Sequence, residues 1–367
     1  MTSALTGRLE AGEVIAERAD ERLERSRLEP YLRRHLEGAE GRLSVRQFGG
    51  GHADLTYLLR FGENEFVLRR PPLGPVPPGS HDVAREYRVL SRLYRAYPLA
   101  PRGLHLCEDE SVIGAPFVIE ERRHGFVIRE DLPSEYVDRP ELNRRIGFAL
   151  VDALADLHLV DPAAIALEGL GRGQGFLERQ IEGWTRRWRG ALALPAQESV
   201  ERRMAPVILW LKEHLPRSAA TSLVHNDYRL DNLLLSSEDP ARVNAVLDWD
   251  MCTQGDPLSD LAYVLNYWLE PEEDPAWRGF MAMPTWRAGF PSRAQATERY
   301  ARRTGFDVGL LPWYLVFSAF KLAVIIQQIY IRYHRGQTRD ERFRDFDTMV
   351  EALAAKAARL AGLSGAA

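Results

Sequence analysis

The fold is decided by His225-Asn226-Asp227-Tyr228-Arg229-Leu230-Asp231-Asn232, together with the later stretch Leu247-Asp248-Trp249-Asp250. Asp227 precedes Asn232 by five positions, and Asp248 follows Asn232 by sixteen. Phosphoryl transfer requires a carboxylate that orients or deprotonates the nucleophile, and oxygen ligands that hold Mg²⁺ against the phosphates. The spacing H-x-D-x-x-x-x-N, followed by a short strand and an acidic residue, supplies both. It predicts the catalytic loop and the metal-binding loop of a kinase-like phosphotransferase.

Short apolar runs flank these loops. Residues 222–224, 232–235 and 243–247 are separated by turn-forming residues, which is typical of short strands joined by turns. The carboxylates are then expected at strand ends, where loops converge. One half of the motif alone would fit an ordinary polar turn, but both halves at this spacing favour the catalytic interpretation.

The composition is that of a globular protein and gives no sign of a nucleic-acid-binding, disulfide-rich or zinc-binding protein. The 367 residues are 45% hydrophobic and 27% charged, as in a globular protein with a sizeable core. A formal net charge of -4 gives no electrostatic case for a nucleic-acid partner. The two cysteines, Cys107 and Cys252, form neither a disulfide framework nor a zinc motif. The N-terminus has no signal-peptide pattern, so a cytoplasmic location is expected.

One long apolar segment, residues 311–331, approaches the length of a membrane span. Lys321, Gln327 and Gln328 interrupt it and Pro312 lies near its start. These polar residues favour a buried helix, and no membrane association is expected.

The chain is expected to divide into three parts. Residues 1–40 are predicted to be a charged helical extension, residues 41–122 a small antiparallel sheet with one main helix (82–97), and residues 123–367 a mainly helical part containing the catalytic block (221–260). The predicted strands of the sheet are 44–48, 55–61, 65–69, 112–113 and 117–120. The predicted helices of the last part are 142–158, 176–188, 200–214, 261–269, 311–333 and 343–363.

Three features of the small part are typical of a nucleotide-binding lobe. Gly49-Gly50-Gly51 lies between two strands, where backbone N–H groups can approach phosphates closely. Arg69 ends a strand and can pair with the α- and β-phosphates, and Glu86 on the following helix can pair with Arg69. Each feature also occurs as ordinary surface structure, but their order relative to the catalytic block favours the functional interpretation.

The chain resembles the aminoglycoside phosphotransferase and choline kinase-like family. It is most similar to the branch that contains kinase domains linked to acyl-CoA dehydrogenases and many actinobacterial phosphotransferases. The residues that carry the resemblance are 66–72, 85–87, 112–118, 225–232, 247–250, 255–257 and 260–262. The resemblance spans about residues 40–340 and implies an α+β, bilobal protein kinase-like fold.

The resemblance also implies roles for single residues. Asp227 is expected to act as the catalytic base, and His225 and Asp260 to brace the catalytic loop. The family pattern implies Mg²⁺ ligands at Asn232, Asp248 and Asp250. It implies ATP or GTP as the phosphoryl donor, bound by the glycine turn, Thr56, Arg69, Glu86 and a hinge from Glu120 to Arg122.

The chain departs from the branch pattern at the phosphate turn. Gly51-His52-Ala53-Asp54-Leu55-Thr56-Tyr57 stands where the branch often has Gly-His-Ser-Asn-Leu-Thr-Tyr. A carboxylate at position 54 is expected to weaken nucleotide binding unless it points away from the phosphates. Arg69 replaces the lysine of protein kinases but also pairs well with phosphate. Asn226 replaces a frequent glycine, and asparagine tolerates a positive φ.

The phosphoryl acceptor is expected to be a hydroxyl group of a small molecule. A hydroxylated acyl compound is favoured by the resemblance, while an aminoglycoside would require an acid-rich pocket. The segment 170–215 instead carries Arg179, Trp184, Arg186, Arg187, Trp188 and Arg189. Arginine clusters bind carboxylates or phosphates, although they also form solvated helix faces. The oligomeric state is open.

Two alternatives remain from the sequence. Asp54, Ala53 and Arg69 also suit a protein that binds a nucleotide without catalysis. A protein kinase would carry Asp-Phe-Gly and Ala-Pro-Glu signatures, and the chain has neither.

Overall fold

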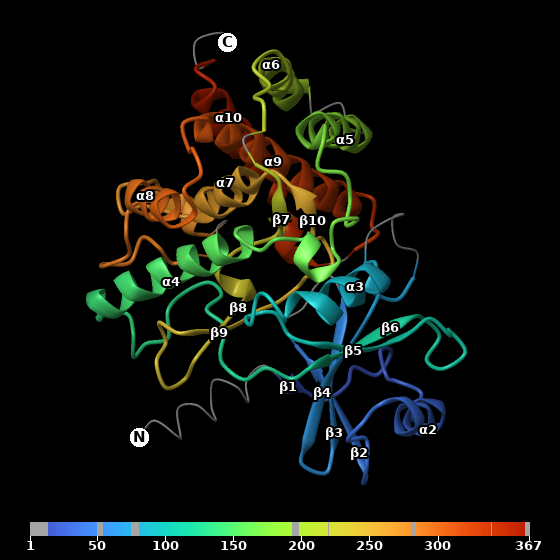
Figure 1. Ribbon diagram of the computed structural model, residues 1–367. Coiled ribbons are helices and arrows are strands. Elements are labelled where there is room, and N and C mark those ends of the chain that lie inside the picture. Colours follow the sequence, from blue (N-terminus) through green and yellow to red (C-terminus); the bar gives the residue numbers. More distant parts are fainter. Residues whose placement is uncertain are drawn as a thin grey trace.

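A computed structural model describes residues 14–49, 54–74, 81–192, 198–218, 220–279, 283–338 and 340–363. Six of the described strands form one antiparallel sheet in the order β1-β2-β3-β4-β6-β5. They are β1 (Val14–Ile15), β2 (Leu43–Phe48), β3 (Leu55–Phe61), β4 (Asn64–Arg70), β5 (Gly103–Cys107) and β6 (Phe117–Glu121). The sheet occupies one end of the molecule and helices occupy the other (Figure 1). The structure therefore confirms the expected kinase-like α+β architecture.

The alternation of side chains explains why this sheet forms. In β2, Leu43 and Val45 are buried whereas Ser44 and Arg46 are exposed, as expected for a strand with one face on a core. The tight turn between β3 and β4 places Gly62 at φ +57°, a conformation that glycine adopts easily. This turn fixes the register in which Thr56 lies opposite Arg69.

One face of the sheet is covered by helix α2 (Arg25–His35). Leu28 and Leu32 of α2 are fully buried and share a core with Tyr57 and Leu59 of β3. The described part of the expected helical extension (residues 1–40) therefore contains the strand β1 before this helix, and β1 pairs with the end of β2. The first 13 residues of that extension lie outside the described residues.

Helix α3 (Val83–Leu93) begins at Asp82, whose side chain accepts a hydrogen bond from the Arg85 N–H. Its buried residues Val89, Leu90 and Leu93 belong to the core of the helical part, not to the core beneath α2. Helix α3 therefore joins the two parts of the molecule and carries Glu86 beside the sheet.

The helical part is organised around α9 (Leu311–His334), which contacts α5, α6, α7 and α10. Among the described residues, α9 is long and apolar enough to span a membrane, but 67% of its apolar window is buried inside the molecule. The prediction of a buried helix is therefore confirmed. The other helices are α4 (Pro140–His158), α5 (Phe176–Ala191), α6 (Glu198–Glu213), α7 (Pro257–Tyr267), α8 (Arg293–Thr304) and α10 (Phe346–Leu360).

Two small two-stranded sheets carry the predicted loops between the sheet and the helices. They pair β7 (Ser222–Val224) with β10 (Thr253–Gly255), and β8 (Leu233–Leu235) with β9 (Val243–Val246). The catalytic loop runs from β7 to β8, and the segment after β9 contains Asp248. Local strand pairing therefore brings both halves of the sequence motif to one place.

The prediction of a strand at residues 112–113 is wrong. Val112 and Ile113 are buried but lie in a turn, in which the N–H of Gly114 donates to the Glu110 carbonyl. The sheet position is taken by β5 instead.

Candidate active site

The catalytic loop is fixed from behind by buried side chains. His225 Nε2 donates to the Leu247 carbonyl at 2.9 Å, and the N–H of Asp227 donates to His225 Nδ1 at 3.3 Å. Asp260 of α7 accepts from the N–H of His225 at 2.6 Å and from the N–H of Asn226 at 2.8 Å. Asn226 has a φ of +69°, which an asparagine tolerates. His225 and Asp260 thus lie where they can hold the loop rather than contact a substrate.

Asp260 is completely buried, which by itself would raise the pKa of its carboxyl group. The pKa is instead lowered, because His158 and the backbone N–H of His225 donate hydrogen bonds to the carboxylate. Asp260 is therefore ionised and braces the loop as a charged acceptor.

Asp227 lies at the front of the loop with both carboxylate oxygens partnered. Asn232 Nδ2 donates to Asp227 Oδ2 at 3.1 Å, and the Tyr263 hydroxyl donates to Oδ1 at 2.8 Å. Arg229 Nε lies 3.5 Å from Oδ1, and 23% of the Asp227 side chain is exposed. These contacts orient the carboxylate while leaving it accessible, as a general base requires.

Arg69 joins the sheet to the segment after β9 that contains Asp248. Its Nη2 lies 2.6 Å from Asp248 Oδ1 and 3.2 Å from Asp54 Oδ2, and its Nε lies 3.2 Å from Glu86 Oε1. Glu120 is 3.9 Å from the same Nε. One guanidinium group is thus surrounded by four carboxylates.

Burial shifts the pKa values of the carboxyl groups in this cluster. Burial raises the pKa of Glu86 well above its usual value and raises the pKa of Glu120 to about 7. Asp248 differs, because the adjacent Arg69 cation lowers its pKa despite burial. Asp248 is therefore an ionised carboxylate that already attracts a cation.

This donor set fits Mg²⁺. Asn232 and Asp248 offer an amide oxygen and a carboxylate oxygen, which are ligands that Mg²⁺ accepts, and both residues line the same cavity. The Arg69 guanidinium donates a hydrogen bond to Asp248 Oδ1, so this carboxylate already has a positively charged partner. A second group, formed by Asp54, His81 and Asp250, has its ligand atoms within 4.8 Å of one another. Asp250 therefore lies beside Asp54 and His81.

The cavity between the sheet and the catalytic loop has a volume of about 440 Å³. Its lining includes several residues expected from the sequence, namely Thr56, Arg69, Glu120, Arg122, Asp227, Asn232 and Asp248. The Arg122 guanidinium lies over the Phe48 ring at 5.0 Å. Glu86 reaches the site through Arg69, and Gly49 directly follows β2, whereas Gly50 and Gly51 lie outside the described residues.

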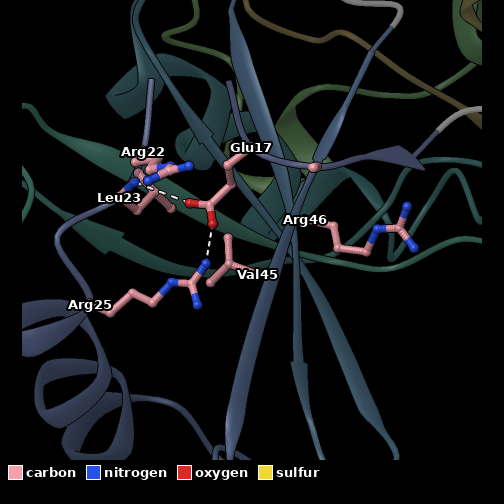
Figure 2. Close-up of a pocket in the computed structure, with 7 residues that line it drawn as sticks. Glu17, Arg22, Leu23, Arg25, Val45 and Arg46 are labelled. Carbon is pink, nitrogen blue, oxygen red and sulfur yellow. Dashed lines mark hydrogen bonds and ion pairs between the residues drawn. The ribbon is translucent and has the colours of Figure 1, made fainter. Parts of the chain in front are cut away.

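A larger cavity of about 520 Å³ lies elsewhere, beside β2. It is lined only by residues 16–46, and Figure 2 shows Glu17 at its centre, accepting from the N–H of Leu23 and paired with Arg25. None of the residues expected to act in catalysis lines it. The cavity between the sheet and the catalytic loop is therefore the candidate active site.

The sequence pattern of the phosphotransferase enzyme family matches residues 44–296. The chain belongs to this family. The match contains the sheet from β2 onward, the catalytic loop and the segment with Asp248.

Acyl-CoA dehydrogenase family member 10 of Mus musculus is 35% identical over 336 residues, which cover 89% of the chain and 30% of the mouse protein. The chain thus spans less than a third of this relative. A crystal structure of a candidate aminoglycoside phosphotransferase from Ralstonia eutropha JMP134 has a TM-score of 0.78 and 32% identity, covering 93% of the chain and 99% of that protein. A mutant of aminoglycoside phosphotransferase APH(4)-Ia, in complex with AMP-PNP and hygromycin B, shares the fold with a TM-score of 0.57 and 18% identity, covering 93% of the chain and 99% of that protein.

Several residues that contact the predicted site did not stand out in the sequence. Tyr263 and His81 contact Asp227 and Asp54, respectively, from segments 36 and 27 positions away. A signal existed for Tyr263, because it lies one helical turn after Asp260 and so faces the same loop. No local pattern pointed to His81.

Proposed function

We propose that the chain transfers the γ-phosphoryl group of ATP to a hydroxyl group of a small molecule, with Mg²⁺ as the metal and Asp227 as the base. The observation that carries this proposal is the convergence of Asp227, Asn232, Asp248 and Arg69 on one cavity. Membership of a phosphotransferase family supports it, as does the AMP-PNP in the complex of the structural neighbour APH(4)-Ia.

In the proposed reaction the acceptor oxygen forms a bond to the γ-phosphorus while the bond from that phosphorus to the bridging oxygen of ADP breaks. Asp227 receives the proton of the acceptor hydroxyl, and Tyr263 and Asn232 hold the carboxylate in position for it. Asn232 and Asp248 would hold a bound Mg²⁺, which would neutralise phosphate charge. Arg69 exchanges contacts with carboxylates for contacts with the α- and β-phosphates.

Asp54 bears on how well the nucleotide binds. Its side chain is only 2% exposed, lying 2.7 Å from His81 Nδ1 and 3.2 Å from Arg69 Nη2. The Arg69 guanidinium and the His81 imidazole therefore both contact this carboxylate, and the hydrogen bond to Asp54 raises the pKa of His81. This pairing supports a functional nucleotide site despite the added acid.

For the acceptor, we propose a hydroxylated acyl compound. The names of the curated relatives connect this type of chain with acyl-CoA dehydrogenases, and the hygromycin B ligand of the structural neighbour gives the aminoglycoside alternative. Helix α5 near the catalytic loop carries arginines, as in Arg187 over the ring of Trp184, which suits an anionic acceptor better than a polycation.

The test begins with thermal unfolding of the protein with ATP or GTP, with and without Mg²⁺. A nucleotide that binds the native state raises the midpoint, by an amount equivalent to about 2.7 kcal/mol at a concentration of 100 times Kd. ADP formation is then followed with hydroxyacyl compounds and aminoglycosides. Asp227→Ala is expected to abolish turnover and to retain the Mg²⁺-dependent shift, whereas the surface control Asp239→Ala retains both.

Turnover that survives in Asp227→Ala would exclude this residue as the base. Binding without turnover of any acceptor would instead favour a non-catalytic nucleotide-binding protein.

A further inference from the structure

Helix α9 carries one buried lysine within its apolar stretch. Lys321 is 6% exposed, and burial lowers the pKa of its ammonium group. Burying a charged amine is costly unless specific contacts compensate it. The contacts made by Lys321 should therefore show what the charge does.

The Lys321 ammonium contacts the catalytic loop directly. Nζ donates to the carbonyl oxygen of Asn226 at 2.9 Å. This oxygen belongs to the peptide unit that joins Asn226 to Asp227, and the N–H of the same unit donates to His225 Nδ1 at 3.3 Å. Both ends of the peptide unit that precedes the Asp227 Cα are therefore held by side chains, one from the loop and one from α9.

The same ammonium lies against the ring that orients the Asp227 carboxylate. Nζ is 4.6 Å from the centroid of the Tyr263 ring and 5.6 Å from that of Trp184, distances at which a cation is attracted by an aromatic face. The Tyr263 hydroxyl donates to Asp227 Oδ1 at 2.8 Å. Burial raises the pKa of Tyr263 well above its ordinary value, so the hydroxyl remains a donor at neutral pH.

We infer that Lys321 is a positioning residue for phosphoryl transfer, which sets the backbone and, through Tyr263, the carboxylate of Asp227. Lys321 acts on the base through the Asn226 carbonyl and Tyr263, and this role needs no contact with the nucleotide. This inference rests on the proposed function, because it assumes that Asp227 is the group to be positioned.

If Lys321 had only a structural role, a different result would be expected. Lys321 would then contribute to stability and leave the turnover of folded protein unchanged. The chain offers a matched control in Lys356 of α10, which is 7% exposed, donates to the Asn266 carbonyl at 3.3 Å and lies 5.3 Å from the centroid of the Trp277 ring. Lys356 thus has the same kind of environment as Lys321 without contacting the catalytic loop.

The experiment compares Lys321→Met with Lys356→Met in the full chain. Both variants remove a buried ammonium group and keep an unbranched apolar stem of four heavy atoms. In Lys321→Met, kcat is expected to fall about 10- to 100-fold, the range caused by a misplaced catalytic group, while Kd for ATP with Mg²⁺ remains that of the wild type. In Lys356→Met, kcat is expected to stay at the wild-type value even if the midpoint of unfolding changes.

A second measurement does not depend on activity. Hydrogen exchange of the backbone amides in the peptide that contains residues 225–229 is expected to rise in Lys321→Met alone, since the loop loses one anchor. The inference is overturned if the two variants show the same kcat, or if they show the same exchange in this peptide.

The two failures are distinguishable. If the wild type transfers phosphate and Lys321→Met does so equally well, the inference fails and the proposed function stands. If the wild type transfers no phosphate to any acceptor tested, the proposed function fails. The exchange comparison then decides alone whether Lys321 holds the loop.

Discussion

Asp260→Asn tests how the catalytic loop is held. The Asp260 carboxylate accepts two backbone N–H groups, from His225 and Asn226, and lies 3.3 Å from His158 Nε2. An asparagine has one oxygen acceptor, so at least one of the three donors must lose its partner. The amide NH₂ group would then face a donor, in a place with no access to water.

The expected loss follows from these contacts. A hydrogen bond to a charged acceptor contributes about 1.5–3 kcal/mol, and an unsatisfied buried donor costs about 1–3 kcal/mol. We therefore expect Asp260→Asn to lower the free energy of unfolding by about 2–4 kcal/mol at pH 7. The control Asp152→Asn removes a carboxylate paired with Arg299 at the surface, where the expected loss is about 0–1 kcal/mol.

Urea unfolding between pH 3 and pH 8 provides the assay. The pKa of Asp260 is lower in the folded state than in the unfolded chain, so its stabilisation is complete above the unfolded value of about 3.9 and is lost as the pH falls through the folded value. The difference between wild type and Asp260→Asn should thus be constant at neutral pH and shrink in acid. A loss no larger than that of Asp152→Asn would refute the assigned role of Asp260.

Three further predictions concern single groups. Burial lowers the pKa of Lys356 to about 8, so the wild type should gain stability as the pH rises from about 8 toward the unfolded value of about 10.4, and Lys356→Met should lack this gain; equal slopes in urea unfolding would contradict it. Asp248→Asn should remove the Mg²⁺-dependent part of the thermal shift with ATP, since the proposed metal ligand loses its charge; an intact Mg²⁺ effect would exclude Asp248 as a ligand. Tyr263→Phe removes the hydroxyl that donates to Asp227 and should lower kcat about 10-fold with little change in Kd for ATP, and an unchanged kcat would show that this hydrogen bond does not orient the base.

The fold was predictable where the hydrophobic pattern is regular. The predicted helices at 142–158 and 311–333 correspond closely to α4 and α9, because their apolar stripes or runs are long. Helix α8 was missed, although Ser292 and Gln295 form a capping box that marks its start. The error at residues 112–113 has another cause. Val112 and Ile113 are apolar because they pack into the core, and two adjacent apolar residues occur in buried turns as well as in strands.

The candidate site was predictable only in part, for a reason that lies in chain distance. The Asp227–Asn232 contact spans five residues and therefore leaves a local motif. Arg69 and Asp248 are 179 positions apart, yet both stood out because each belongs to a local pattern of its own. The contact of Asp54 with His81 has no such pattern, so the sequence could show an unusual acid but not the imidazole that contacts it.

The contact of Lys321 with the catalytic loop also could not be predicted from the sequence. In the sequence, Lys321 is a charged residue within an apolar segment and therefore argues against a membrane span. This interpretation agrees with the buried position of α9. Its partner, the carbonyl oxygen of Asn226, is a backbone group 95 positions away, and a backbone group can have any side chain attached. A sequence motif does not reveal such a contact. The lysine side chain is one particular residue type, whereas the backbone carbonyl that it contacts is present in every residue. Residues that hold a catalytic loop by its backbone are therefore found from the structure, by asking why a costly charge is buried.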